Sequence, residues 1–153
     1  MLHFKKTALL SLLLINPIAW ADTPKQLVKQ GYSLTVQVNK LRNTKGVVRF
    51  SLYNKKGSIP DENYQKFYQQ LQGKINNGIA SVTFKDLPKG RYAINILHDE
   101  NNNKKIDKGF LLPTEGVGFS QYKSIGLRNR PTFSKASFEL NSNITKQVTV
   151  IYF

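Results

Sequence analysis

Residues 79–97 read IASVTFKDLPKGRYAINIL and carry the clearest structural pattern in the chain. Two runs within them, 79–84 and 92–97, have the length and the β-branched and aromatic content of strands. Between these runs, the sequence KDLPKG at 85–90 supplies the Pro and Gly of a turn. The pattern predicts two consecutive strands joined by a short connection.

A related pattern precedes this stretch. Residues 32–41 alternate apolar and polar side chains, which predicts a half-buried strand. After turn residues at 43–46, the run 47–53 alternates in the same way and places Arg49 and Ser51 on its outward face. The two runs predict a hairpin with one apolar face.

The C-terminal part adds another predicted strand pair, at 133–140 and 145–152. The segment 62–71 instead spaces its aromatic and apolar side chains as a helix does, which predicts either one short helix or a connection that carries aromatic side chains. About seven short strands with turn signals every ten residues or so are typical of an antiparallel sandwich or a small barrel. The sequence therefore predicts an all-β fold.

The N-terminus has the three parts of a secretory signal peptide. Lys5 and Lys6 supply the charged region, residues 8–15 are an apolar run, and AWA at 19–21 is a small-x-small cleavage site. Cleavage after Ala21 would leave residues 22–31 as a linker and residues 32–153 as a single domain. We therefore expect an exported protein, periplasmic or secreted, with no transmembrane segment after cleavage.

The chain is strongly basic and lacks cysteine. Its 23 Lys and Arg residues against 9 Asp and Glu residues give a formal net charge of +14. An exported basic protein attracts anionic partners, here an anionic surface, glycan or lipid, and Lys123, Arg128 and Arg130 are candidates for such a face. Because the charges are not gathered in blocks, nucleic acid is not the expected partner, and a solubilising surface explains them equally well.

Residues 98–107 read HDENNNKKID and contain the most distinctive chemical pattern. Counted from Asp99, oxygen-bearing side chains stand at positions 1, 3, 5 and 9, the alternation that calcium loops use. These candidate calcium ligands are Asp99, Asn101, Asn103 and Asp107, with Glu115 as a candidate for the missing carboxylate.

Three features oppose calcium in this loop. Lys104 stands where such loops need glycine, and Phe110 stands where they need a bidentate glutamate. Lys104, Lys105 and Lys108 add positive charge, which repels a divalent cation. The alternative is a structural turn in which the Asp and Asn side chains bind their own backbone. No other cofactor is expected.

Catalysis is not the expected function. Beyond the predicted signal peptide, His98 is the one histidine, and the absence of cysteine excludes a Cys-His pair. An enzyme using His98 and Ser120 remains an alternative, although the residues around Ser120 do not form a nucleophile elbow. Gly116 and Gly118 lack the preceding strand and following helix of a phosphate-binding loop, so we expect them to shape a surface excursion.

Several motifs in the same order resemble the bacterial domain of unknown function family 2141. They are LPKGRYA at 87–93, HDENNN at 98–103 with KID at 105–107, PTEGVGFS at 113–120, and FSKASF at 133–138. The resemblance covers residues 32–152 and implies a small exported bacterial protein with a presumed β-sandwich and no assigned activity. The sequence departs from the family at Lys104, where the family usually has glycine, which weakens any implied metal binding.

The turn LPKGRY at 87–92 is also similar to that of transthyretin-like sandwiches, where it joins two core strands. These resemblances imply an Ig-like or transthyretin-like antiparallel β-sandwich. The function that we predict is a non-catalytic binding or accessory module, with the loop region 98–120 as its functional surface. A small outer-membrane β-barrel is the remaining alternative, because the chain is strand-rich and ends in TVIYF.

Overall fold

The structure, a computed structural model, describes residues 31–153. The predicted signal peptide at 1–21, and all of the predicted linker except Gly31, lie outside the described residues.

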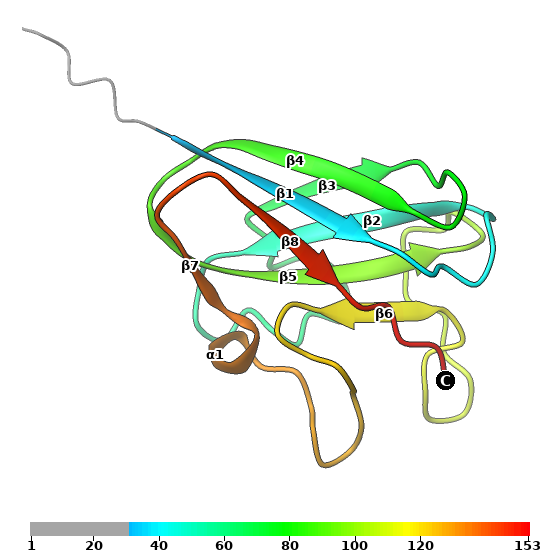
Figure 1. The fold of residues 1–153 in the computed structure, drawn as a ribbon. Helices are drawn as coiled ribbons and strands as arrows, with labels where there is room; N and C mark the ends of the chain where they lie inside the picture. The colour runs from blue at the N-terminus through cyan, green and yellow to red at the C-terminus, as the bar shows by residue number, and fades with distance from the viewer. Residues whose placement is uncertain (1–30) are drawn as a thin grey trace, which may run out of the picture.

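The predicted β-sandwich is confirmed, because the strands form two separate sheets (Figure 1). The three strands of the first sheet are β1 (Tyr32–Val38), β4 (Ala80–Leu87) and β8 (Ile144–Val148), in the order β4-β1-β8. The second sheet contains β2 (Val47–Tyr53), β3 (Gln69–Gly73), β5 (Gly90–Asp99), β6 (Gly116–Phe119) and β7 (Phe138–Leu140). Its order is β3-β2-β5-β6, and β7 pairs with the first residues of β5.

The predicted hairpin of 32–41 and 47–53 and the predicted C-terminal strand pair are both wrong, because the two strands of each fall in different sheets. β1 pairs antiparallel with β4 and parallel with β8, whereas β2 pairs antiparallel with β3 and β5. β7 and β8 are likewise separated. The physical reason is that each strand has an apolar face, and a connection that crosses between the sheets lets two such faces meet in one core. That core includes Leu34 and Val36 from β1 and Phe50 and Leu52 from β2.

The central strands of the second sheet, β2 and β5, are buried on both faces. Arg49 and Ser51, predicted to face solvent, are buried, and so is every residue of β5 from Tyr92 to Asp99. The segments between the strands cover this outer face. Together with residues of the strands they form a second apolar cluster: Tyr53, Ile59, Ala93, Phe119, Tyr122, Phe133 and Ala136. Figure 1 shows α1 and the long loops on this side of the second sheet.

The segment 62–71 forms no helix, and of the two predicted structures the connection is the one found before β3. The carboxylate of Asp61 accepts hydrogen bonds from the backbone N–H groups of Gln65 (3.1 Å) and Lys66 (2.8 Å), which holds the chain in a turn before β3. The helix that does occur in the described residues is α1 (Phe133–Ala136), at the start of the predicted strand 133–140. Thr132 caps it by accepting a hydrogen bond from the N–H of Lys135.

Gly116 and Gly118 form the buried strand β6 and not the predicted surface excursion. The reason is the close approach of the C-terminal segment, which pairs with β6 through Val117 and Ile151. A Cβ atom on Gly118 would lie 2.4 Å from the backbone oxygen of Thr149. Glycine is therefore required where these two backbones meet.

Candidate functional site

The predicted loop region begins at the end of β5 with a buried ion pair. Asp99 is fully buried, and its Oδ2 atom accepts a hydrogen bond from Nε of Arg49 at 2.6 Å. Arg49 also donates from its terminal nitrogen to Oδ1 of Asn102 at 2.7 Å. The guanidinium group thus supplies positive charge next to the first predicted calcium ligand.

The backbone of the loop coils around the side chains of Asp99 and its neighbours. The N–H groups of Asn103 and Lys104 donate to the two oxygens of Asp99, each at 2.9 Å. The N–H of Asn103 also reaches Oδ1 of Asn101, and the N–H of Lys105 reaches Oδ1 of Asn103. Lys104, at the position where glycine is usual, adopts a φ of 69°. The observed backbone conformation therefore fits both predictions, the structural turn and the coil of a calcium loop.

Asp107 closes the exposed half of the loop. Its carboxylate accepts hydrogen bonds from the amide groups of Asn101 (2.6 Å) and Asn103 (2.9 Å). Four of the five predicted ligands, Asp99, Asn101, Asn103 and Asp107, are thus joined by hydrogen bonds within one loop.

Glu115 folds back onto this loop, as the sequence suggested. It is buried, and its two oxygens accept hydrogen bonds from the backbone N–H groups of Glu100 (2.9 Å) and Asp107 (3.2 Å). Burial raises the pKa of Glu115, although these two hydrogen bonds act in the opposite direction. Within residues 31–153, no three or more His, Cys, Asp or Glu side chains are grouped so that they could hold a metal ion.

His98 and Ser120 are both buried and both bonded to the protein itself. Nδ1 of His98 lies 2.7 Å from the hydroxyl of Tyr152, and its Nε2 lies 3.0 Å from the carbonyl oxygen of Lys45. Ser120 donates to the carbonyl of Ala136 and accepts from the N–H of Ile94. Since His98 stands four residues beyond Ile94 on β5, the two side chains are separated by roughly 13 Å. The structure does not bring them together.

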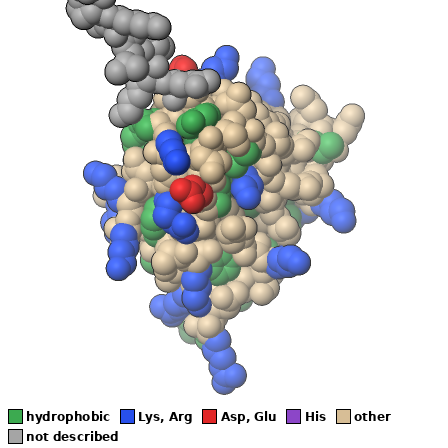
Figure 2. Space-filling model, turned by 60° about the vertical axis from the view of Figure 1, so that its left-hand side comes forward, with side chains coloured by type: hydrophobic (Ala, Val, Ile, Leu, Met, Phe, Trp, Pro, Cys, Tyr) green, Lys and Arg blue, Asp and Glu red, His purple; other side chains and the backbone are tan. Residues whose placement is uncertain are grey.

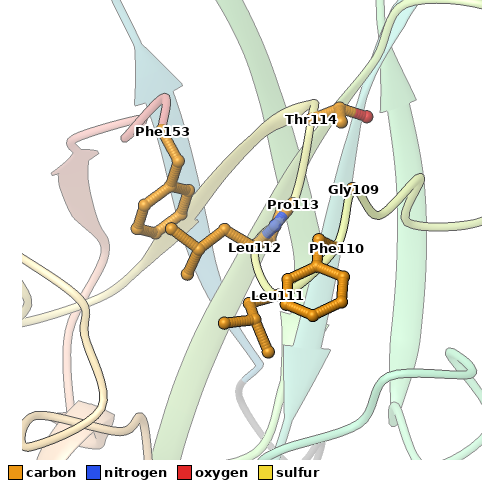
Figure 3. A pocket seen from close by; sticks show the side chains of 7 residues that line it. All are labelled: Gly109, Phe110, Leu111, Leu112, Pro113, Thr114 and Phe153. Atoms are coloured by element: carbon orange, nitrogen blue, oxygen red, sulfur yellow. The ribbon is translucent and has the colours of Figure 1, made fainter.

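The tip of the same loop carries an apolar surface that the sequence analysis missed. Phe110 is 98% exposed and Leu111 is 77% exposed. Figure 3 shows their side chains in a row with those of Leu112 and Phe153, along a shallow hollow between the loop tip and the C-terminus. The sequence contains one sign of this surface, since the apolar run FLL at 110–112 stands inside a polar loop.

Basic side chains are spread over the surface (Figure 2). Lys123, Arg128 and Arg130, the predicted basic residues, are all exposed and lie in the loop 120–132. A second shallow hollow, also missed, is lined by three lysines together with Gly57, Ser58, Gln65 and Phe67; the lysines are Lys55, Lys56 and Lys66. Among the described residues, no helix is long and apolar enough to cross a bilayer.

Comparison with known proteins gives a family but no individual relative. A family model with the description "Uncharacterized protein conserved in bacteria (DUF2141)" matches residues 36–148, which include both sheets and the loop region. No curated protein and no solved structure matches the chain.

Proposed function

The chain belongs to the DUF2141 family of uncharacterized bacterial proteins, and from its own residues we propose that it is an exported, non-catalytic binding module. Export is supported by the three-part pattern at residues 1–21. We place the contact region in the loop between β5 and β6, residues 100–115.

One observation carries this proposal: the loop region separates buried reactive groups from an exposed apolar tip. His98, Ser120, Asp99 and Glu115 are buried, and each is hydrogen-bonded to other parts of the protein. Groups held in this way are occupied in maintaining the fold. The tip, by contrast, exposes large apolar side chains that a soluble protein rarely leaves uncovered as a patch unless something binds there.

The proposal is tested with an anilinonaphthalene sulfonate dye, which fluoresces when it binds apolar surface. We expect saturable dye binding by the native protein, and we expect the double substitution Phe110→Ser and Leu111→Ser to remove most of it without changing the thermal midpoint. The matched control is Ile79→Ser, because Ile79 is an exposed apolar side chain in the turn before β4. Dye binding that survives the tip substitutions would contradict the proposal.

Calcium binding by the same loop is a second candidate function. The observation that favours it is the coil described above, in which Asp99, Asn101 and Asn103 accept backbone N–H groups and Lys104 adopts the left-handed conformation. Against it stands Arg49, whose guanidinium group already neutralises Asp99.

Thermal unfolding in calcium and in chelator separates the two roles of the loop. If calcium is bound by the folded state alone, the midpoint rises by several degrees in calcium, and Asp107→Asn removes the rise. Glu139→Gln, on the exposed side of β7, is the control and leaves it in place. If Arg49 is the cation that holds the loop, calcium and chelator give the same midpoint.

A further inference from the structure

Two long loops leave the second sheet from the same place. Ile106, in the loop 100–115, and Ile125, in the loop 120–132, both pack against one cluster formed by Tyr64, Leu97 and Val117. Figure 1 shows the two loops extending from the same side of the molecule, away from the first sheet. Their tips therefore present a common face to whatever the protein meets.

Each loop ends in a tight turn with apolar side chains at its tip. In the first loop, a β-bridge between Lys108 and Pro113 closes a turn that contains Phe110 and Leu111. In the second, a β-bridge between Gly126 and Asn129 encloses Leu127, which is 76% exposed. Of the eight large hydrophobic residues exposed among the described residues, five lie on these tips or beside them: Phe110, Leu111, Leu112, Leu127 and Phe153.

The two loops that carry these apolar tips also carry exposed basic side chains. Lys104 and Lys105 are exposed in the first loop, and Lys123, Arg128 and Arg130 are exposed in the second. Lys108 is also close to the first tip, but its ammonium group pairs with Glu62. The two loops therefore combine exposed apolar tips with five exposed basic side chains.

We propose that these two tips dock the protein on the surface of an anionic phospholipid bilayer, which makes the bilayer the ligand of the binding module proposed above. The apolar residues enter the boundary between head groups and acyl chains, while the five basic residues contact the phosphates. The positive charge of these side chains, and of the chain as a whole, is opposite to that of an anionic membrane. Highly exposed apolar side chains on two separate loops also suit a deformable lipid interface, whereas a protein partner would need a surface shaped to both tips.

A single tryptophan tests the depth of docking. The one tryptophan of the chain, Trp20, lies in the predicted signal peptide, so Leu111→Trp in the processed protein reports from the tip alone. On addition of phosphatidylglycerol vesicles, we expect its emission to shift to the blue and to become protected from a water-soluble quencher. Lys85→Trp in the processed protein is the control, because Lys85 lies on β4 near the turn that joins β5, at the end of the sandwich remote from Asp99. Its emission stays unchanged.

Vesicle co-sedimentation measures the contribution of each part. Phe110→Ser with Leu111→Ser should lower partitioning onto phosphatidylglycerol vesicles by more than about tenfold. Lys104→Ala with Lys105→Ala should lower it by about thirtyfold, which is about fivefold for each charge. The control pair Lys85→Ala with Lys89→Ala removes the same charge from the remote end and should have a much smaller effect. Binding should weaken in high salt and be absent on phosphatidylcholine vesicles.

The alternatives give different results. Equal partitioning of the tip variant and the unmodified protein would overturn the proposal. So would a monomer–dimer equilibrium that the tip substitutions abolish, because a second copy would then cover the tips. All measurements are made in chelator, so that calcium binding does not enter. Dye binding at the tip without vesicle binding would reject the bilayer as ligand and leave the tip as a contact region for something else.

Discussion

At the scale of single residues, the pair of Arg49 and Asp99 is expected to be important for stability. Asp99 is fully buried and Arg49 nearly so, and the two side chains are 2.6 Å apart. Arg49→Met leaves a carboxylate buried without a counter-charge, and we expect a loss of about 3 kcal/mol in the free energy of unfolding. Urea denaturation measures this, with the exposed Lys85→Met as the control that changes little. A small loss at Arg49 would show that the loop repacks without it.

Two buried tyrosines on the outer side of the second sheet should respond differently to loss of the hydroxyl group. The hydroxyl of Tyr53 donates to Oδ2 of Asp61 at 3.1 Å, whereas among the described residues the hydroxyl of Tyr64 has no partner. Tyr53→Phe should cost about 1 kcal/mol in the free energy of unfolding, and Tyr64→Phe should be neutral or slightly stabilising. Equal losses for the two variants in urea denaturation would contradict this assignment.

Glu100 makes stability depend on pH. Burial disfavours its charged form, but hydrogen bonds from Asn43 and Arg42 and the charge of Arg42 outweigh burial and lower the pKa of Glu100. A lowered pKa in the folded state stabilises the protein above the unfolded value of about 4.3, and this stability is lost as pH falls through the folded value. Glu100→Gln should therefore reduce the loss of stability in acid, measured by urea denaturation from neutral to acidic pH.

Glu115 provides an internal control of opposite sign. Because burial raises its pKa, this carboxyl group makes the folded state relatively more stable as pH falls towards the unfolded value, and that contribution is lost as pH rises through the folded value. Glu115→Gln should therefore make the loss of stability in acid steeper. If both variants shift the pH profile in the same direction, the two pKa assignments are wrong.

At the scale of elements, β6 depends on the absence of a side chain at Gly118. Gly118→Ala would bring a methyl group against the backbone of Thr149, which cannot move aside as a flexible side chain can. We expect a loss of about 2 kcal/mol in the free energy of unfolding. Gly126→Ala is the control, because no atom lies within 4 Å of its added Cβ. An equal, small effect of both substitutions would contradict the close packing of β6.

The strands could be predicted from local pattern, but their partners could not. The alternation at 32–41 and 47–53 locates β1 and β2 because it reflects one buried face per strand. The same alternation fits a hairpin and a crossing between sheets equally well. Arg49 shows a second limit: it is buried, and its partners Asp99 and Asn102 stand 50 and 53 residues further along the chain, so no local pattern predicts its burial.

The candidate site was also predicted only in part. The prediction of one hydrogen-bonded loop is confirmed for Asp99, Asn101, Asn103 and Asp107. It succeeds because short polar side chains that alternate along the chain bind the backbone only a few residues away, which is a local effect. The partnership of Asp99 with Arg49 joins residues of two different strands and has no local signal. The exposure of the apolar tips could not be predicted, because neither the run of three residues at 110–112 nor the single Leu127 has a periodicity that assigns it to a buried or an exposed face.

At the scale of the whole molecule, the proposed export predicts the mass of the mature protein. We expect the protein recovered from the cell envelope or medium to lack residues 1–21, because its N-terminus has the form of a cleavable signal. Intact mass spectrometry checks this, and Ala19→Asp with Ala21→Asp is the control that should leave the uncleaved chain. Full-length protein in the cytoplasm would contradict both export and docking on an external membrane face.

The position of the C-terminus has a practical consequence. Phe153 lies beside Leu112 at the edge of the apolar tip, while Gly31 packs against Asp86 at the opposite end of the sandwich. An affinity tag or fluorescent protein fused after Phe153 would stand directly on the surface under study and could mask its activity in any screen. A fusion placed between residues 22 and 31 would leave that surface open.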